Sequence, residues 1–192
     1  ARWGSVSNDA SGVTVGTDNH AAGRLAGRHL IENGRRRIAF LGHADEHYPE
    51  FHGRYLGLTT ALEEAGLGPD KRLQFDAITT EEAGHDAART LLASGTPFDA
   101  IFAASDLIAI GAMRALAEAG RKVPGDIAVV GFDDIPAASL TTPPLTTVMQ
   151  DITGAGAALV ETLIAQIDGR ETAPRKLPGK LVVRASSGAA EA

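Results

Sequence analysis

The feature that most constrains the fold is a repeated alternation of short apolar runs with longer helical patterns. Four runs are almost continuously apolar, at residues 37–42, 73–78, 100–104 and 127–132. Strands of this kind are buried on both faces, as in a parallel sheet covered by helices. The first three runs are each followed by a stretch whose apolar residues recur at three- and four-residue steps before a glycine. This alternation predicts βαβ units and an α/β fold with a doubly wound parallel sheet.

The two ends of the chain carry further elements. Amphipathic helices are predicted at residues 18–33 and 152–167, and a short strand at 13–15 precedes the first of them. A proline-containing stretch at 172–178 then leads to a last strand at 181–184.

Composition excludes several classes of protein. The 192 residues carry a net charge of −6, so the chain lacks the basic surface that dominates nucleic-acid affinity. It has no cysteine, which excludes disulfides and thiolate chemistry. No stretch approaches the roughly 20 apolar residues of a membrane span. The first residues have no apolar core typical of a signal peptide, and we expect the chain to begin partway through a longer protein.

Polar residues follow every predicted strand of the central region. Because ligands bind beyond the carboxyl ends of the strands in an open parallel sheet, these residues predict a polar cleft. A helix-capping role is the alternative for Ser105 and Asp106, and for Asp106 we favour the cap. Asp133 has no such role, since Ile135 and Pro136 interrupt any following helix. The positions after the strands are His43, Asp45, Thr79, Thr80, Ser105, Asp106, Asp133 and Asp134.

Arg54 is predicted to open the helix after the first strand, where the helix dipole does not favour a cation. An exposed arginine is the ordinary alternative. If Arg54 points into the cleft opposite Asp133, the pair can recognise adjacent hydroxyls or an anionic group. We then expect Arg54→Ala and Asp133→Ala to abolish ligand binding while leaving thermal unfolding largely intact.

The motifs of enzymes and metal proteins do not occur. The glycines at 154–156 lack the strand and spacing of a dinucleotide-binding loop, and the histidines at 43, 47 and 52 match no zinc signature. There is no nucleophile elbow and no Walker loop, and the basic run at 35–37 is too short for a nucleic-acid patch. We therefore expect no catalysis, no metal and no cofactor.

Four stretches resemble the effector domain of LacI/GalR-type bacterial transcription repressors. They read DNHAAGRLAGRHLIENGRRRIAFLG, GRYLGLTTALEEAGL, FDAIFAASDLIAIGAMRALAEAGRKVPGDIAVVGFDD and PPLTTVMQD. The segment VPGDIAVVGFDD followed by PLTTV is highly specific, and the resemblance spans residues 13–187.

The resemblance implies a periplasmic-binding-protein-like type I architecture, with two lobes joined by three crossovers. The crossovers would fall near residues 33–36, 147–150 and 173–178. A partial N-terminal lobe would then hold residues 1–34 and 149–173, and a C-terminal effector and dimerisation lobe residues 35–148 and 174–192. The first lobe would be incomplete and the helix-turn-helix missing, so we expect the remaining helices of that lobe to be exposed, poorly ordered or packed on another chain.

The resemblance also implies roles for particular residues. Ser105 stands where many members have asparagine, which leaves the ligand's identity open, and for Asp18 a cap role is a close alternative. The helix at 106–119 resembles the family's dimer helix, with Leu107, Ile110 and Arg114 at the interface. The positions implied to bind the effector are Arg54, Asp133, Ser105, Gln150, Tyr48 and Asp18.

The function implied is that of a sugar-responsive repressor. A small effector, a sugar or sugar derivative, would shift the orientation of the lobes, and the missing N-terminal domain would bind operator DNA. The protein would be a cytoplasmic homodimer with no membrane contact. One alternative is a periplasmic sugar-binding protein of an uptake system. Another is a doubly wound enzyme that uses a nucleotide.

Overall fold

The larger lobe is built on a six-stranded sheet. We analysed a computed structural model that describes residues 1–5 and 12–188, so the end of the predicted C-terminal lobe, 189–192, lies outside the described residues. The strand order is β4-β3-β5-β6-β7-β9, and every neighbouring pair is parallel except β7 and β9. The strands are β3 (Ile38–Leu41), β4 (Gln74–Phe75), β5 (Ala100–Ala103), β6 (Ala128–Asp133), β7 (Thr146–Met149) and β9 (Lys180–Val182).

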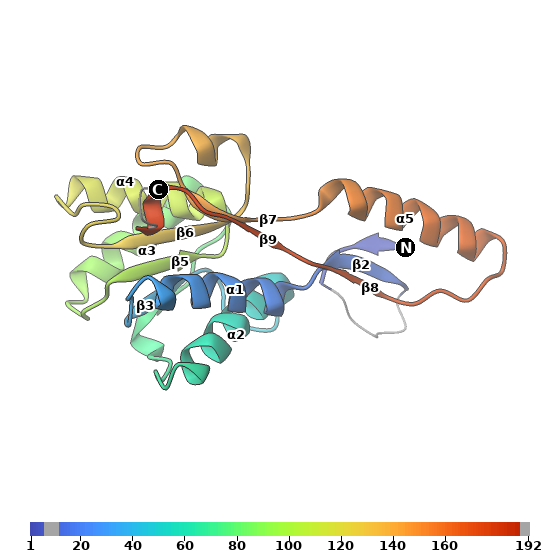
Figure 1. Ribbon diagram of the computed structural model, residues 1–192, viewed down its shortest axis with the longest axis horizontal. Helices are drawn as coiled ribbons and strands as arrows, with labels where there is room; N and C mark the ends of the chain where they lie inside the picture. Colours follow the sequence, from blue (N-terminus) through green and yellow to red (C-terminus); the bar gives the residue numbers. More distant parts are fainter. Residues whose placement is uncertain (6–11, 189–192) are drawn as a thin grey trace.

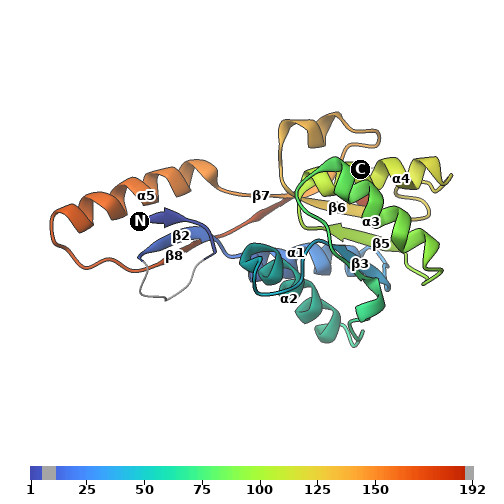
Figure 2. The same cartoon turned by 180° about the vertical axis from the view of Figure 1, so that it is seen from behind.

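Helices cover both faces of this sheet, as the apolar runs predicted. Figures 1 and 2 show α1 and α2 on one face and α3 and α4 on the other. The phenylalanines Phe40, Phe102 and Phe132 lie fully buried between these layers. The four helices are α1 (Asn19–Glu32), α2 (Pro49–Glu64), α3 (Glu81–Ala93) and α4 (Asp106–Glu118), and short 3-10 turns occur at η1 (Lys71–Leu73), η2 (Pro136–Leu140) and η3 (Ala185–Ser187).

Helix α1 packs on α2 so closely that only glycine fits at the contact. A Cβ atom on Gly23 would lie 2.2 Å from the backbone oxygen of Arg54, and one on Gly57 would lie 2.2 Å from the backbone oxygen of His20. The helix therefore belongs to the larger lobe. The domain boundary predicted at residue 34 is wrong at this point, and the first crossover lies at Asp18, where β2 ends and α1 begins.

The smaller lobe holds the rest of the chain. Its sheet has the order β1-β2-β8, with all strands parallel: β1 (Arg2–Trp3), β2 (Thr14–Thr17) and β8 (Arg175–Leu177). Because β8 pairs here, the boundary predicted at residue 174 also moves, to the link between Leu177 and Lys180.

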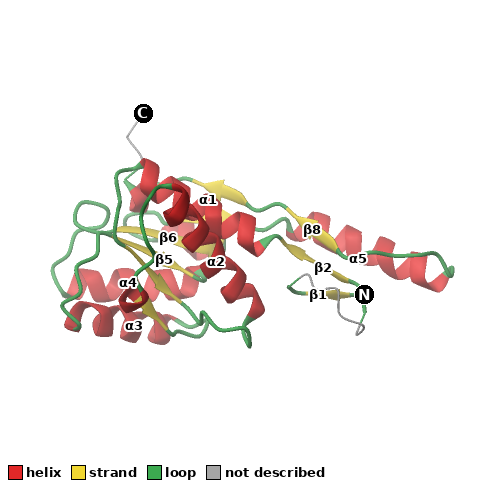
Figure 3. Cartoon of the chain, turned by 90° about the horizontal axis from the view of Figure 1, so that it is seen from below, coloured by secondary structure: helices red, strands yellow, loops and turns green. Residues whose placement is uncertain are grey.

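Helix α5 (Ile152–Ile167) lies along this small sheet (Figure 3). The side chains that it buries there are small, while five of its large apolar residues are between 49% and 75% exposed and Leu159 is half-buried. The expectation that the helices of the first lobe are exposed, poorly ordered or packed on another chain holds for α5, which is exposed, but not for α1, which packs on α2. The exposed residues are Ile152, Val160, Leu163, Ile164 and Ile167. Among the described residues, no helix is long and apolar enough to cross a membrane.

Candidate functional site

Arg54 lies in the second turn of α2 and not at its start, because the helix begins at Pro49. Its side chain is almost fully buried, at 5% exposure. Nε donates to Oδ1 of Asn19 over 2.9 Å, and Nη1 donates to the backbone oxygen of Ala104. The guanidinium carbon lies 3.6 Å from the centre of the Phe132 ring. Contacts from α1, from the residue that follows β5 and from β6 therefore fix the guanidinium. They revise the expectation that Arg54→Ala would leave thermal unfolding largely intact.

Asp133 is the last residue of β6 and lies one position after Phe132. Nε2 of Gln150 donates to Oδ1 of Asp133 over 2.7 Å, and Oγ1 of Thr17 donates to Oε1 of Gln150 over 2.7 Å. The backbone φ of Asp133 is 114°, a value that side-chain-bearing residues rarely adopt. Strain of this kind occurs preferentially at functional positions. A hydrogen-bonded chain thus links the carboxylate to the first and second crossovers.

Arg54 and Asp133 interact electrostatically. Burial lowers the pKa of Arg54 to about 10, against the opposing charges of Asp133, Glu50 and Asp106. Burial raises the pKa of Asp133, while Arg54 and the hydrogen bond from Gln150 act in the opposite direction. The hydrogen bonds of Arg54 go to Asn19 and Ala104 rather than to Asp133. The two charges therefore share one rim of the sheet without forming a hydrogen-bonded pair.

The sequence favoured Asp106 as the cap of α4, but in the structure Ser105 is the cap. Oγ of Ser105 caps α4 by accepting from the backbone N–H of Ile108 over 3.4 Å. The Asp106 carboxylate instead accepts from Oγ1 of Thr147 over 2.6 Å and from the N–H of Ile135 over 2.9 Å. The prediction that Asp106 is the cap is wrong. Burial raises its pKa to about 6, against the effect of both hydrogen bonds.

The two remaining predicted positions lie nearer the surface. Tyr48 is 42% exposed, and its ring stacks on His43 with 3.9 Å between the ring centres. Asp18 caps α1 by accepting from the N–H of Ala21 over 3.1 Å, and Nζ of Lys176 lies 3.9 Å from its other oxygen. The capping alternative for Asp18 is confirmed.

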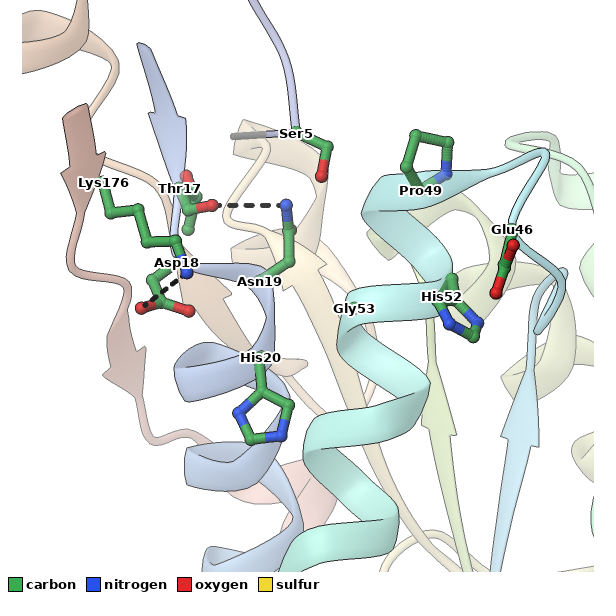
Figure 4. Close-up of a pocket in the computed structure, with 10 residues that line it drawn as sticks. All are labelled: Ser5, Thr17, Asp18, Asn19, His20, Glu46, Pro49, His52, Gly53 and Lys176. Carbon is green, nitrogen blue, oxygen red and sulfur yellow. Dashed lines mark hydrogen bonds and ion pairs between the residues drawn. The ribbon is translucent and has the colours of Figure 1, made fainter. Parts of the chain in front are cut away.

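A hollow of about 350 Å³ lies beside this cluster, between α1, α2 and the small sheet (Figure 4). Of the six predicted positions, only Asp18 lines it. Thr17 and Asn19 also line it, and they connect it through Gln150 to Asp133 and directly to Arg54. The lining residues are Ser5, Thr17, Asp18, Asn19, His20, Glu46, Pro49, His52, Gly53 and Lys176.

Sequence patterns missed Thr17, Asn19 and Glu50. Asn19 accepts the hydrogen bond of Arg54, and Oε1 of Glu50 accepts from the N–H of Ser5 over 2.7 Å, so that α2 contacts the smaller lobe. A polar residue near the start of a helix is ordinarily interpreted as a capping residue, so nothing in the sequence indicated that these three residues bridge the elements around the site. Within the described ranges, no group of three or more acidic or histidine side chains could hold a metal ion.

Known proteins resemble this chain over most of its length. Residues 28–187 match the family model described as a periplasmic binding protein-like domain. The HTH-type transcriptional regulator CelR of Thermobifida fusca is 39% identical over 163 residues, covering 85% of this chain and 48% of that protein. The ribose operon repressor of Halalkalibacterium halodurans is 36% identical over 172 residues, covering 88% and 51%.

Solved structures agree. A CelR–cellobiose complex superimposes with a TM-score of 0.85 at 38% identity, covering 91% of this chain and 54% of that one. A regulatory protein of the LacI family from Chloroflexus aggregans gives 0.88 at 34% identity, covering 97% and 67%. The chain spans about half the length of the curated relatives it matches. It belongs to the periplasmic binding protein-like domain family and corresponds to the effector-binding region of LacI-type transcriptional regulators.

Proposed function

We propose that this chain binds a sugar or sugar derivative between its two lobes, with Arg54 and Asp133 as the principal contacts, and passes the signal to a DNA-binding region outside the chain. The observation that carries the proposal is the buried guanidinium beside a strained carboxylate at the crossover rim of the larger sheet. Such a pair offers one donor group and one acceptor group to a ligand.

Relatives support the sugar class. CelR has been solved with cellobiose, and a LacI family regulator from Enterococcus faecium with bound ribose. These relatives are regulators rather than enzymes, and they favour the repressor over the alternative of a periplasmic uptake protein.

The lobes are joined where Asp18, Gln150 and the link after Leu177 cross between the sheets. Gln150 hydrogen-bonds both Asp133 and Thr17, so the ligand-side carboxylate is tied to two of the three crossovers. A ligand that contacts Asp133 more favourably in one lobe orientation shifts the population toward that orientation. This shift would couple effector binding to operator affinity.

Pairing of two copies through α4 belongs to the same proposal. Leu107 and Ile110 are only partly buried, and Arg114 is exposed on the same helix. In this proposal the regulator acts in the cytoplasm as a homodimer. It binds operator DNA through a region that lies outside this chain.

A thermal-shift panel of sugars on the intact protein tests the proposal, followed by calorimetry with any sugar that stabilises it. We expect at least one sugar to bind, and we expect Asp133→Asn to weaken that binding by about tenfold or more, the loss of one charge-assisted hydrogen bond. The absence of binding by any sugar, or unchanged affinity in Asp133→Asn, would contradict it.

A further inference from the structure

The turn that follows β6 holds two consecutive aspartates, Asp133 and Asp134, with positive φ. Their φ values are 114° and 55°, and no other non-glycine residue in the described ranges has a positive φ. Aspartate adopts the second value with little strain, but the first lies outside the regions that residues with a side chain normally occupy. A strained conformation of this kind persists only where neighbouring contacts over-determine it. The contacts of the turn therefore show what holds the Asp133 carboxylate in place.

The backbone just after Asp133 is held by side chains from other elements. The N–H of Asp134 donates to Oγ1 of Thr147 over 3.4 Å, and the N–H of Ile135 donates to Oδ2 of Asp106 over 2.9 Å. Oγ1 of Thr147 in turn donates to Oδ1 of Asp106 over 2.6 Å, and both side chains are fully buried. These two residues therefore fix the backbone of the turn, but they leave the carboxylate of Asp134 to another partner.

That partner is Arg184, which lies two residues after β9. Its Nη2 pairs with Oδ1 of Asp134 over 2.6 Å, and its Nη1 donates to the backbone oxygen of Leu145 over 2.7 Å. The side chains of the ion pair are only 20% and 19% exposed, so water screens it less than a surface pair. Because two nitrogens of one planar guanidinium have separate acceptors, the direction of the Asp134 side chain is fixed.

Arg184 is itself anchored to the larger sheet. Its backbone N–H donates to Oγ1 of Thr146 over 2.8 Å, at the start of β7. Two residues later, Oγ of Ser186 donates to the backbone oxygen of Val129 in β6 over 2.7 Å and accepts from the N–H of Thr146 over 2.8 Å. Ser186 is fully buried. The segment that carries Arg184 is therefore attached to both β6 and β7, and it provides a fixed point from which the guanidinium can hold Asp134.

We propose that Arg184 is a positioning residue for effector binding: by pairing with Asp134 it holds Asp133 in its unusual backbone conformation and so fixes where the Asp133 carboxylate meets the ligand. Arg184 itself does not touch the ligand in this proposal. The inference rests on the proposed function for the ligand, but the conformation of Asp133 can be measured without any ligand. The ordinary alternative is an ion pair that only stabilises the fold.

The first test is nuclear magnetic resonance on the ligand-free protein. The three-bond coupling between the amide and α protons of Asp133 reports its φ, because this coupling is small at 114° and large in extended backbone. We expect the coupling to rise in Arg184→Met and in Asp134→Gly, as Asp133 relaxes toward extended backbone. Glycine accepts the φ of 55° at position 134, so Asp134→Gly removes the contact with Arg184 without straining that position.

Arg72→Met is the matched control for this measurement. Arg72 pairs with Asp70 over 2.7 Å at the amino end of β4, whereas the turn lies at the carboxyl end of β6. Loss of the Arg72 pair should leave the coupling of Asp133 unchanged.

The second test is calorimetry with a sugar that the thermal-shift panel identifies, beginning with cellobiose and ribose. Because release of a strained residue is worth roughly 1–3 kcal/mol, we expect Arg184→Met and Asp134→Gly each to weaken binding by about tenfold. The double variant should bind little worse than either single one, since both changes remove the same contact. Arg72→Met should bind like the wild-type protein.

Asp134→Asn separates geometry from charge. Asparagine tolerates a positive φ, and its amide oxygen can still accept from Nη2 of Arg184. We therefore expect this variant to retain affinity within about threefold of the wild-type protein, because a neutral hydrogen bond replaces a charge-assisted one. A pair that only stabilises the fold would lower the melting temperature of all these variants and leave the affinity, measured well below that temperature, unchanged.

A coupling of Asp133 that stays small in both Arg184→Met and Asp134→Gly overturns the inference, as does wild-type affinity in Arg184→Met. It is also overturned if Asp134→Asn binds as weakly as Asp134→Gly, since the charge and not the geometry then matters. In each of these cases a sugar that binds the wild-type protein leaves the proposed function standing. If the coupling rises as expected while no sugar binds the wild-type protein, Arg184 does position Asp133 and the proposed function fails.

Discussion

Replacement of Arg54 by methionine removes a buried cation and both hydrogen bonds that hold it. The side chain is 5% exposed, so the partners cannot turn to water. The backbone oxygen of Ala104 and the amide oxygen of Asn19 lose their donor. Asp133 and the two other carboxylates lose their counter-charge. Methionine fills part of the volume and avoids the burial cost of the charge. Loss of one partner from a buried ionic cluster typically costs about 3–5 kcal/mol, so we expect a loss near the lower end, about 3 kcal/mol.

For a domain of this size, such a loss lowers the melting temperature by on the order of 10 °C. Urea denaturation followed by circular dichroism measures it directly. Arg24→Met is the matched control, because Arg24 pairs with Glu64 on the exposed surface of α1 and its loss should scarcely change stability. If both variants unfold like the wild-type protein, Arg54 is not part of the core, and the burial argument fails.

Three further changes are expected to have measurable effects. Folding raises the pKa of Asp106 from 3.8 to about 6, so the folded protein retains a proton that the unfolded chain releases. The contribution of Asp106 to the free energy of unfolding therefore falls by about 2 kcal/mol as the pH rises from 4 to 6. Urea midpoints across that range should therefore fall more steeply in the wild-type protein than in Asp106→Asn, and equal slopes would refute the assignment. Gly57→Ala should destabilise the fold by about 1–3 kcal/mol, because the added Cβ would collide with the backbone oxygen of His20. Gly156→Ala, in the open part of α5, should stabilise it by about 0.5–1 kcal/mol. Melting temperatures that change in the same direction in both variants would contradict this packing. Thr17→Val should weaken sugar binding several-fold by releasing Gln150, and calorimetry showing wild-type affinity would remove the hydrogen-bonded chain from the mechanism.

The central strands were predictable because continuous apolar runs have few other uses in a chain of this size. The strand β7 was not, since Thr146 and Thr147 read as polar. Both are fully buried, and their hydroxyls are satisfied by Ser187 and Asp106. The strand predicted at 73–78 shrinks to Gln74–Phe75, because η1 takes up its first residue and the chain then leaves the sheet. Such outcomes depend on tertiary partners that periodicity does not reveal.

The position of α1 shows the same limit. An amphipathic pattern indicates that a helix has a buried face, but it does not say which sheet that face covers. The lobe is decided by the approach of Gly23 and Gly57, two glycines far apart in the chain. For α2 the sequence did hold a usable signal. Proline favours the first turn of a helix, so Pro49 marks the start of α2 and places Arg54 in its second turn.

At the site, the two charged residues could be predicted but their surroundings could not. Arg54 and Asp133 lie on elements whose ends meet at one rim of a parallel sheet, which topology alone implies. Two nitrogens of the guanidinium donate to Asn19 and Ala104, which come from different parts of the chain, and no sequence pattern indicates that these residues meet.

A double-mutant cycle on sugar binding tests most directly whether Arg54 and Asp133 hold one ligand. Calorimetry would compare the wild-type protein, Arg54→Lys, Asp133→Asn and the double variant; asparagine tolerates the positive φ at position 133 and lysine retains the charge at 54. We predict that each single change weakens binding by about tenfold or more and that the double variant loses little beyond the larger single loss, a coupling of at least about 1 kcal/mol. Losses that simply add, or wild-type affinity in either single variant, would contradict the shared site.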